Sequence, residues 1–557
     1  MAYDKHVKQV NKDFYNPYSF VPLPSKVCYL PDDYAKGLKT AQDVPFADAK
    51  SGKITVTYEA LTPFCVREGG DNSSNVNING KYFVPATSLK GMIRSVLEVV
   101  SLSDPRNGIS DSRYSLRDLR SKYYELKSGE QSSGFLVQIN GNFFVVKCTS
   151  EKWTYEEIKK DEGIVDIERF KKCKTIEEKY KMIKSMVIEF DDDSSCMWFF
   201  SGSMESKKHE YLFDIPKSFS NLIPILDEEY EDFIFIHEKE NENKSWSFWK
   251  KRLKNYASVE DITKDGYEGI VPCFFRTKKA ADGTVSVKDL GFSYLYRQPY
   301  KKTIHDYIPL EDANGRLDLA QAIFGYVNGS DALKGRVHFS HSFIENAKVC
   351  DERVFVLGSP KPTFYPFYLE QKSRYNGQLN TYFSKDTRIS GTKRYLQQKQ
   401  AVAKGEAAKN ANMPTHFVPL QVGTTFANDI VFHNLRELEL GALIAAITFC
   451  RQSDCCHSLG YAKPFGYGRM RVKGLTVELD GKQVADEVLD RAYKAFVRFV
   501  TDNAGQTEHQ WKYSLDALFA IARGNYKENK IVRYPVLKEF SVIKQNKDAL
   551  SDFSPIK

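Results

Sequence analysis

The run from Leu459 to Val472 combines three residue types that suit contact with a nucleic acid. Gly466 and Gly468 permit a positive φ and a close approach of the backbone to a ligand. Lys463 and Arg469 supply positive charge, and aromatic residues stand between them. Since phosphates attract cations and unstacked bases pack on aromatic rings, these four residues are candidate RNA contacts. A glycine-rich turn that leads into a strand explains the run equally well.

A second candidate lies at the start of an amphipathic helix that we expect from Leu89 to about Ser101. Either Thr87 or Ser88 is expected to cap this helix. Free backbone N–H groups and the positive end of the helix dipole make such a terminus an anion site. Lys90 and Arg94 are four residues apart, so both project from one face and could reach consecutive phosphates. A solvated helix face is the alternative.

Composition is compatible with an anionic partner but does not require one. The chain has 557 residues, a net charge of +8 and 13% aromatic residues. This length predicts about two to four domains. Residues 371–409 are strongly basic, and Arg388, Lys393 and Arg394 are the RNA-contact candidates of that segment. A basic surface loop would have the same composition.

The location of the protein is predicted from its N-terminus and its cysteines. The polar N-terminus predicts no signal peptide, and no apolar run is long enough to cross a membrane. Ten cysteines without paired spacing are typical of reduced thiols. We therefore expect a cytoplasmic protein without membrane contact. Cys450, Cys455, Cys456 and His457 lack the spacing of a zinc site, so no metal is expected there.

The order of the expected elements indicates an α+β fold. Strand, helix, two strands, helix and strand follow one another, which is the order of a split βαβ, ferredoxin-like or RRM-like sheet. The expected elements are Gly52–Ala60, Leu89–Ser101, Gly335–Phe343, Ile430–Phe432, Leu435–Phe449 and Met470–Val477.

Changes in composition divide the chain into five expected segments. Charged pieces without an internal repeat interrupt the core, so we expect an insertion there. The segments are an extended N-terminal arm (1–50), the first half of the core (51–104), a large insertion (105–319), the second half of the core with a basic loop and the glycine-rich loop (320–480), and a helical C-terminal region (481–557).

Three motifs in this order resemble the RAMP superfamily of CRISPR-associated proteins. Residues 82–98 read Tyr-Phe-Val-Pro-Ala-Thr-Ser-Leu-Lys-Gly-Met-Ile-Arg-Ser-Val-Leu-Glu, similar to the family's (I/V)PGTSLKGxxRxxLE. Ile323–Gly325 with Gly335–Ser340 is similar to a second motif, and the glycine run looks like the family's glycine-rich loop. Ala86 departs from the usual glycine. The segment Gly291–Pro309 points to the large type III members.

The resemblance implies an RNA-binding subunit of a type III CRISPR effector complex with a RAMP core. Its partners would be CRISPR RNA, target RNA and other effector subunits in antiviral defence. Backbone subunits of this type cut target RNA with a loop aspartate and a divalent metal. This implies Asp71 as the catalytic residue and Mg²⁺ as the cofactor, with no other cofactor expected. A turn that Asp71 merely caps is the alternative.

Two other functions remain open. An endoribonuclease that processes the CRISPR transcript without a metal would need a histidine as general base. His305, His338 and His341 are available, but the last two would face opposite sides of a strand. A non-catalytic structural subunit, in which the insertion makes protein contacts, is the third possibility.

Overall fold

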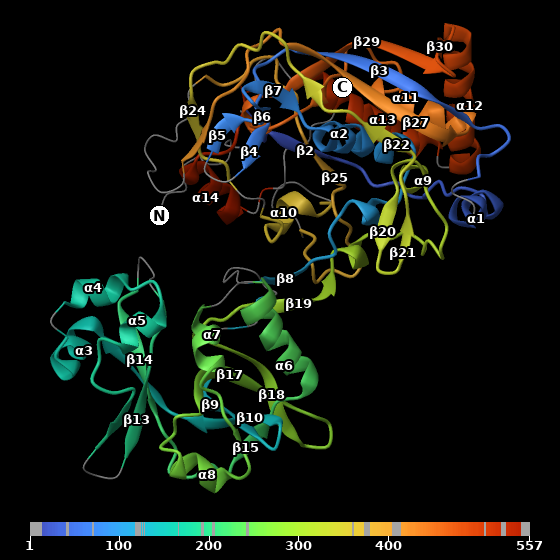
Figure 1. Ribbon diagram of the computed structural model, residues 1–557. Coiled ribbons are helices and arrows are strands. Elements are labelled where there is room, and N and C mark those ends of the chain that lie inside the picture. Colours follow the sequence, from blue (N-terminus) through green and yellow to red (C-terminus); the bar gives the residue numbers. More distant parts are fainter. Residues whose placement is uncertain are drawn as a thin grey trace. The chain divides into compact units, whose positions relative to one another are not determined.

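The computed structural model consists of two compact units. The core unit comprises Met1–Asp111 and Ile304–Lys557, and the inserted unit comprises Ser112–Thr303 (Figure 1). The inserted unit begins and ends inside the expected insertion of 105–319. The structure describes residues 14–40, 44–69, 72–116, 124, 126, 129–164, 166–190, 194–202, 207–240, 244–358, 361–371, 379–403, 414–505, 508–524, 531–546 and 548.

The main sheet of the core unit has the strand order β22-β27-β3-β29-β28. All neighbouring strands in it are antiparallel. Helix α2 follows β3 in the chain, and α11 connects β27 to the segment before β29. This is the strand order of a ferredoxin-like sheet, so the expected α+β fold is confirmed. The bounds are β3 (Lys50–Ala60), α2 (Ala86–Val100), β22 (Val337–Phe339), β27 (Thr425–Leu435), α11 (Glu437–Ile447), β28 (His457–Ser458) and β29 (Arg469–Leu479).

Strict alternation in β3 explains why this strand lies at the centre of the sheet. Ile54, Val56 and Tyr58 are fully buried, while the residues between them are polar. Successive side chains of a strand point to opposite faces, so one face of β3 packs into the core. Helix α11 is buried nearly all round because it contacts α2, α9 and α12.

The described part of the N-terminal segment contains a strand and a helix where an extended arm was expected. Strand β2 (Tyr18–Val21) pairs with β25 (Thr392–Tyr395), and α1 (Asp32–Thr40) follows. The segment Phe383–Pro414 lacks apolar periodicity, which predicts a long basic loop or a flexible helix. That prediction is wrong at β25. Neither strand is evident from the local sequence, because the partner of each strand is far away in the sequence.

Short strands and helices complete the core unit. The expected strand Gly335–Phe343 is divided into β22 and β23. The remaining bounds are β1 (Phe14–Tyr15), β4 (Arg67–Gly69), β5 (Asn72–Asn75), β6 (Asn77–Ile78), β7 (Lys81–Val84), α9 (Leu319–Phe324), β20 (Tyr326–Asn328), β21 (Asp331–Leu333), β23 (Ser342–Phe343), β24 (Arg353–Phe355), α10 (Tyr365–Tyr368), β26 (Thr415–Phe417), β30 (Lys482–Gln483), α12 (Asp486–Ala504), α13 (Glu508–Arg523), β31 (Ile531–Val532) and α14 (Leu537–Asn546).

The inserted unit contains two antiparallel sheets with the orders β15-β10-β9-β17-β18 and β11-β14-β13-β12. Aromatic and branched aliphatic side chains together form the core that α3, α4 and β13 share. The bounds are β8 (Arg113–Leu116), β9 (Ser132–Ile139), β10 (Asn142–Cys148), β11 (Ser150–Thr154), α3 (Tyr155–Glu162), α4 (Ile167–Lys172), α5 (Ile176–Tyr180), β12 (Val187–Glu189), β13 (Ser195–Phe199), β14 (His209–Asp214), β15 (Leu222–Pro224), α6 (Asp227–Ile234), α7 (Lys244–Lys250), β16 (Asn255–Tyr256), α8 (Val259–Lys264), β17 (Val271–Lys279), β18 (Val285–Gly291) and β19 (Gln298–Thr303).

None of the helices in the described part of the chain is both long enough and apolar enough to span a membrane.

Candidate functional site

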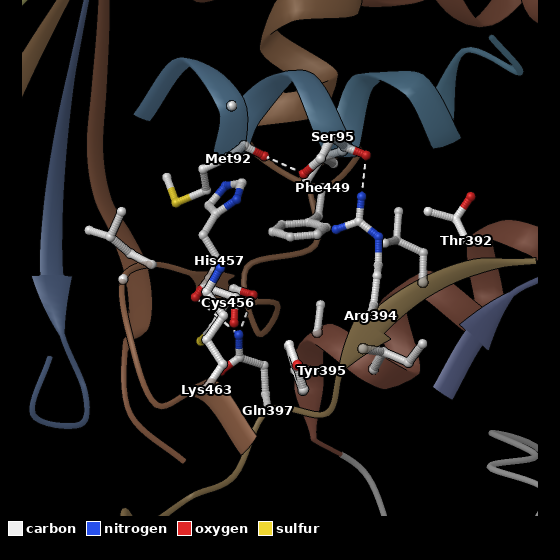
Figure 2. A pocket seen from close by; sticks show the side chains of 18 of the residues that line it. Met92, Ser95, Thr392, Arg394, Tyr395, Gln397, Phe449, Cys456, His457 and Lys463 are labelled. Carbon is white, nitrogen blue, oxygen red and sulfur yellow. Dashed lines mark hydrogen bonds between the residues drawn. The ribbon is translucent and has the colours of Figure 1, made fainter. Parts of the chain in front are cut away.

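One cavity of the core unit joins four segments that are far apart in the sequence. It has a volume of about 560 Å³ and lies between α2, the segment around β25, the stretch from Phe449 to Lys463 and helix α13. In Figure 2, Arg394 extends from β25 towards α2, and His457 lies on the opposite side of the cavity. We call it the basic cavity. Five of the candidates from the sequence line it: Thr87, Ser88, Lys393, Arg394 and Lys463.

Helix α2 begins earlier than the sequence suggested. Pro85 precedes the helix with φ of −61°, and no side chain caps it. The Ala86 N–H donates to His341 Nδ1 at 3.2 Å. The expectation that Thr87 or Ser88 caps the helix is therefore wrong, because the fixed φ of proline already sets the start of the helix. Both residues lie in the first turn and line the basic cavity.

Lys393, Arg394 and Lys463 are the basic residues that line this cavity, and Arg394 and Lys463 are the most deeply buried of them. The Arg394 guanidinium donates through Nη2 to the Ser95 carbonyl, while its buried Nε has no hydrogen-bond partner among the described residues. Burial lowers the pKa of Arg394 to about 10, and Glu98 acts in the opposite direction. Burial, and then the nearby Arg394, also lower the pKa of the Lys463 amine.

An anion is the ligand that this electrostatic environment favours. No aspartate or glutamate lines the basic cavity within the part of the chain that the structure describes. Burial and like charge both disfavour the protonated form of a lysine, which is why the pKa of Lys463 falls. A bound phosphate would stabilise both cations and accept hydrogen bonds from them.

His457 is a cavity residue that the sequence suggested only as part of an unsuitable zinc set. Its Nε2 lies 2.8 Å from the Ile447 carbonyl oxygen, and its buried Nδ1 has no partner in the described structure. Burial lowers the pKa of His457 to about 4, so the imidazole is neutral at pH 7. A general base works best with a pKa near the working pH, so His457 fits a hydrogen-bond acceptor better.

Gln397 fixes the backbone beside His457. Its Nε2 donates to the His457 carbonyl at 3.1 Å, and its own backbone N–H donates to the Ile521 carbonyl, also at 3.1 Å. Figure 2 shows Gln397 below His457. No local pattern in the sequence indicates this residue, because all these contacts are long-range.

Lys90 and Arg94 share a face of α2, as expected, but that face is turned towards α9. The Lys90 amine lies 6.0 Å from the centroid of the Phe324 ring. Arg94 forms a salt bridge with Glu98 at 2.9 Å and donates to the Gly325 carbonyl at 3.4 Å. Neither residue lines the basic cavity. Their contact with RNA stays a prediction.

Gly466 and Gly468 have the positive φ values expected of them, +81° and +80°. A Cβ at Gly468 would lie 1.8 Å from the Leu459 carbonyl oxygen, and one at Gly466 would lie 2.5 Å from that of Gln400. These glycines therefore permit a close approach between two parts of the chain itself. Whether they also contact RNA stays a prediction.

The other RNA-contact candidates lie outside the basic cavity. Arg469 donates through Nη2 to the Arg523 carbonyl at 3.2 Å. Arg388 is exposed to solvent. Asp71, the candidate catalytic residue, lies outside the described residues.

The histidines and cysteines considered for catalysis or metal binding do not form a common cluster among the described residues. His305 contacts the Ile109 carbonyl at 2.6 Å, and the His338 ring stacks on His433 at a centroid distance of 5.9 Å. None of the ten cysteines, all of which the structure describes, forms a disulfide. Across the residues that the structure describes, no group of three His, Cys, Asp or Glu side chains could hold a metal ion.

Comparison with known proteins matches one family to the first half of the core. Residues 57–118 match the RAMP superfamily. None of the curated proteins compared with the chain matches it.

Two solved structures align with the chain at low identity. The first, "CRISPR RNA-guided surveillance complex, pre-nicking", is 9% identical over 83% of this chain and 89% of its own, with a TM-score of 0.21. The second, "Cryo-EM structure of the Type III-B Cmr-beta bound to cognate target RNA", is 10% identical over 80% of this chain and 99% of its own, with a TM-score of 0.19.

The matched segment contains the C-terminal end of β3, from Thr57 to Ala60, and all of α2. These elements lead into the ferredoxin-like sheet and include the motif at residues 82–98 from which the resemblance was predicted. Over residues 57–118 the chain therefore matches the RAMP superfamily, which confirms that resemblance.

Proposed function

We propose that this chain is an RNA-binding subunit of a type III CRISPR effector complex and that its basic cavity contacts the backbone of the CRISPR RNA. The observation that carries the proposal is the pairing of Arg394 and Lys463 in one cavity that has no acidic residue among its described lining residues. The RAMP match supports the family. The assignment to type III rests on the resemblance of Gly291–Pro309.

The lining of the cavity suits a phosphodiester. The Thr87 and Ser88 hydroxyls lie at the start of α2, where the helix dipole favours a negative charge. Lys463 supplies a point charge, and the buried Arg394 supplies a planar donor. Such contacts fix the position of an RNA strand without reading its sequence.

Replacing Lys463 with glutamine is expected to weaken RNA binding and its dependence on salt. Removing one phosphate interaction should lower the slope of log K against log salt by about 0.7 for a single strand. Fluorescence anisotropy of a labelled single-stranded RNA, titrated at several NaCl concentrations, measures both quantities.

Lys482→Gln is the matched control, because Lys482 is exposed on β30 and lies outside the cavity. It makes the same change in net charge. Equal losses of affinity in the two variants would contradict a phosphate site at Lys463. If the unsubstituted protein binds no RNA at low salt, the proposed function is wrong.

Cleavage of target RNA through Asp71 and Mg²⁺ is the catalytic part of the proposal. Asp71→Asn should slow Mg²⁺-dependent cleavage by about a hundredfold or more, the usual effect of losing a catalytic carboxylate. Asparagine caps a turn as well as aspartate does, so a purely structural Asp71 would leave cleavage unchanged. Gel analysis of labelled target RNA measures the rate.

Asp312→Asn is the control for this experiment, because Asp312 is a well-exposed carboxylate elsewhere in the core unit. It should leave cleavage intact. Metal-independent cutting of the CRISPR transcript that survives Asp71→Asn would instead favour the processing endoribonuclease.

A further inference from the structure

A second cavity of the core unit is lined mainly by aromatic rings. It has a volume of about 300 Å³, at the lower end of the range of ligand pockets. We call it the aromatic cavity. Its rings come from β2, α10, α14 and the residues before α14: Tyr18, Phe364, Phe367, Tyr368, Tyr534 and Phe540.

The rings surround the cavity at tilted angles. The Tyr18 ring lies 6.3 Å from Tyr368 and 6.5 Å from Tyr534, centroid to centroid, with interplanar angles of 40° and 54°. Phe364 and Phe540 lie 5.3 Å apart at 59°. Walls of this kind favour a flat, unsaturated ligand, because aromatic rings gain from stacked and edge-to-face contacts.

Asn16 adds a polar group to this apolar wall. Its side chain lines the cavity, and the residue is only 2% exposed. Neither Oδ1 nor Nδ2 has a hydrogen-bond partner among the described residues. A buried polar group without a partner is destabilising, so a ligand that offers a donor and an acceptor side by side would gain from both. Asparagine recognises adenine in this way, through N6–H and N7.

Lys393 connects the aromatic cavity to the basic cavity, since it lines both. Its Nζ lies 4.1 Å from the centroid of the Tyr18 ring and 5.9 Å from that of Tyr368. A cation beside aromatic rings, at the boundary with a phosphate-binding cavity, is where the backbone of a nucleotide would lie if its base entered the rings.

We propose that the aromatic cavity holds one unstacked base, preferentially adenine, of the RNA whose backbone contacts the basic cavity. Asn16 reads the edge of the base, the surrounding rings hold its faces, and Lys393 attracts the adjoining phosphate. This inference rests on the proposed RNA binding, and it adds a base preference that phosphate contacts alone do not give.

Two oligonucleotides of equal length, oligoadenylate and oligouridylate, test the preference by fluorescence anisotropy. The unsubstituted protein should bind oligoadenylate about tenfold more tightly, the discrimination typical of one bidentate contact. Asn16→Leu should reduce this ratio to about one, because oligoadenylate loses its contact with the amide. It should not lower the melting temperature, because an apolar group of similar size replaces an amide without partners.

Asn142→Leu is the control, because Asn142 is exposed at the start of β10 in the inserted unit. It should retain the preference. Equal binding of the two oligonucleotides, or a preference that survives Asn16→Leu, overturns the base site and leaves the proposed function standing.

Titration with adenosine 5′-monophosphate against ribose 5-phosphate, followed by tyrosine fluorescence, separates the base from the phosphate. Tighter binding of the nucleotide, abolished in Asn16→Leu, supports the base site even where an oligonucleotide fails to bind. Equal binding of the two small ligands overturns it. Failure of every RNA to bind, with equal binding of the small ligands, overturns the base site and the proposed function together.

Discussion

Replacing Glu439 with glutamine is expected to lower the free energy of unfolding of the core unit by about 3–5 kcal/mol. The side chains of Arg336 and Glu439 are 5% and 0% exposed, and they form a bidentate salt bridge. Removing the carboxylate leaves the guanidinium charged, buried and without a counter-ion. Urea unfolding followed by circular dichroism measures the change.

The pair matters because it joins three parts of the core unit. Arg336 precedes β22 and donates through Nη2 to the Ala322 carbonyl of α9 at 3.0 Å. Glu439 in α11 also accepts the Arg436 N–H at 2.9 Å. The second helix of the ferredoxin-like fold is thereby fixed against both α9 and the sheet.

Glu437→Gln is the matched control, two residues earlier on α11. Its carboxylate pairs with Arg491 at the surface, where such pairs contribute less than about 1 kcal/mol. Similar losses of stability in the two variants would show that the buried Arg336–Glu439 pair contributes no more to the free energy of unfolding than a surface pair.

Sequence patterns were sufficient to predict the helices and strands that show local periodicity. Alternation in β3 and apolar spacing in α2 and α11 predicted the elements whose order defines the sheet. Arg336 stands in one of the motifs from which the family was recognised, but its partner lies 103 residues away. No local pattern identifies such a pair.

The residues of the candidate site likewise fall into those that local sequence suggests and those that depend on long-range contacts. Thr87, Ser88 and Lys463 were suggested by residue type, and they line the basic cavity. Lys90 and Arg94 were placed on one face correctly, but periodicity does not say which neighbour that face meets. No sequence pattern indicates that His457 and Gln397 line the cavity, because long-range contacts place both residues there.

The buried charges of the inserted unit give the second large effect. Glu210 pairs with Lys179 at 2.6 Å, both side chains being fully buried, and it also pairs with Lys207. Glu210→Gln should lower the free energy of unfolding of this unit by about 3–5 kcal/mol, because two ammonium groups lose their counter-ion. Hydrogen exchange of β13 and β14, followed by mass spectrometry, locates the change.

Glu168→Gln tests the same substitution at an exposed pair with Lys171 on α4. It should leave the free energy of unfolding nearly unchanged, because solvent screens the exposed pair. If β13 and β14 were equally protected from hydrogen exchange in both variants, the buried group of Lys179, Lys207 and Glu210 would not stabilise the inserted unit.

The pH dependence of Glu210→Gln distinguishes the loss of charge pairing from altered packing. Burial already lowers the pKa of Lys207, while Glu210 raises it, so removing Glu210 must lower that pKa further. The unfolded variant then binds more protons than the folded one, and its stability rises with pH. The deficit should shrink between pH 7 and pH 10, about the usual pKa of lysine. A deficit that stays constant over this range would indicate altered packing instead.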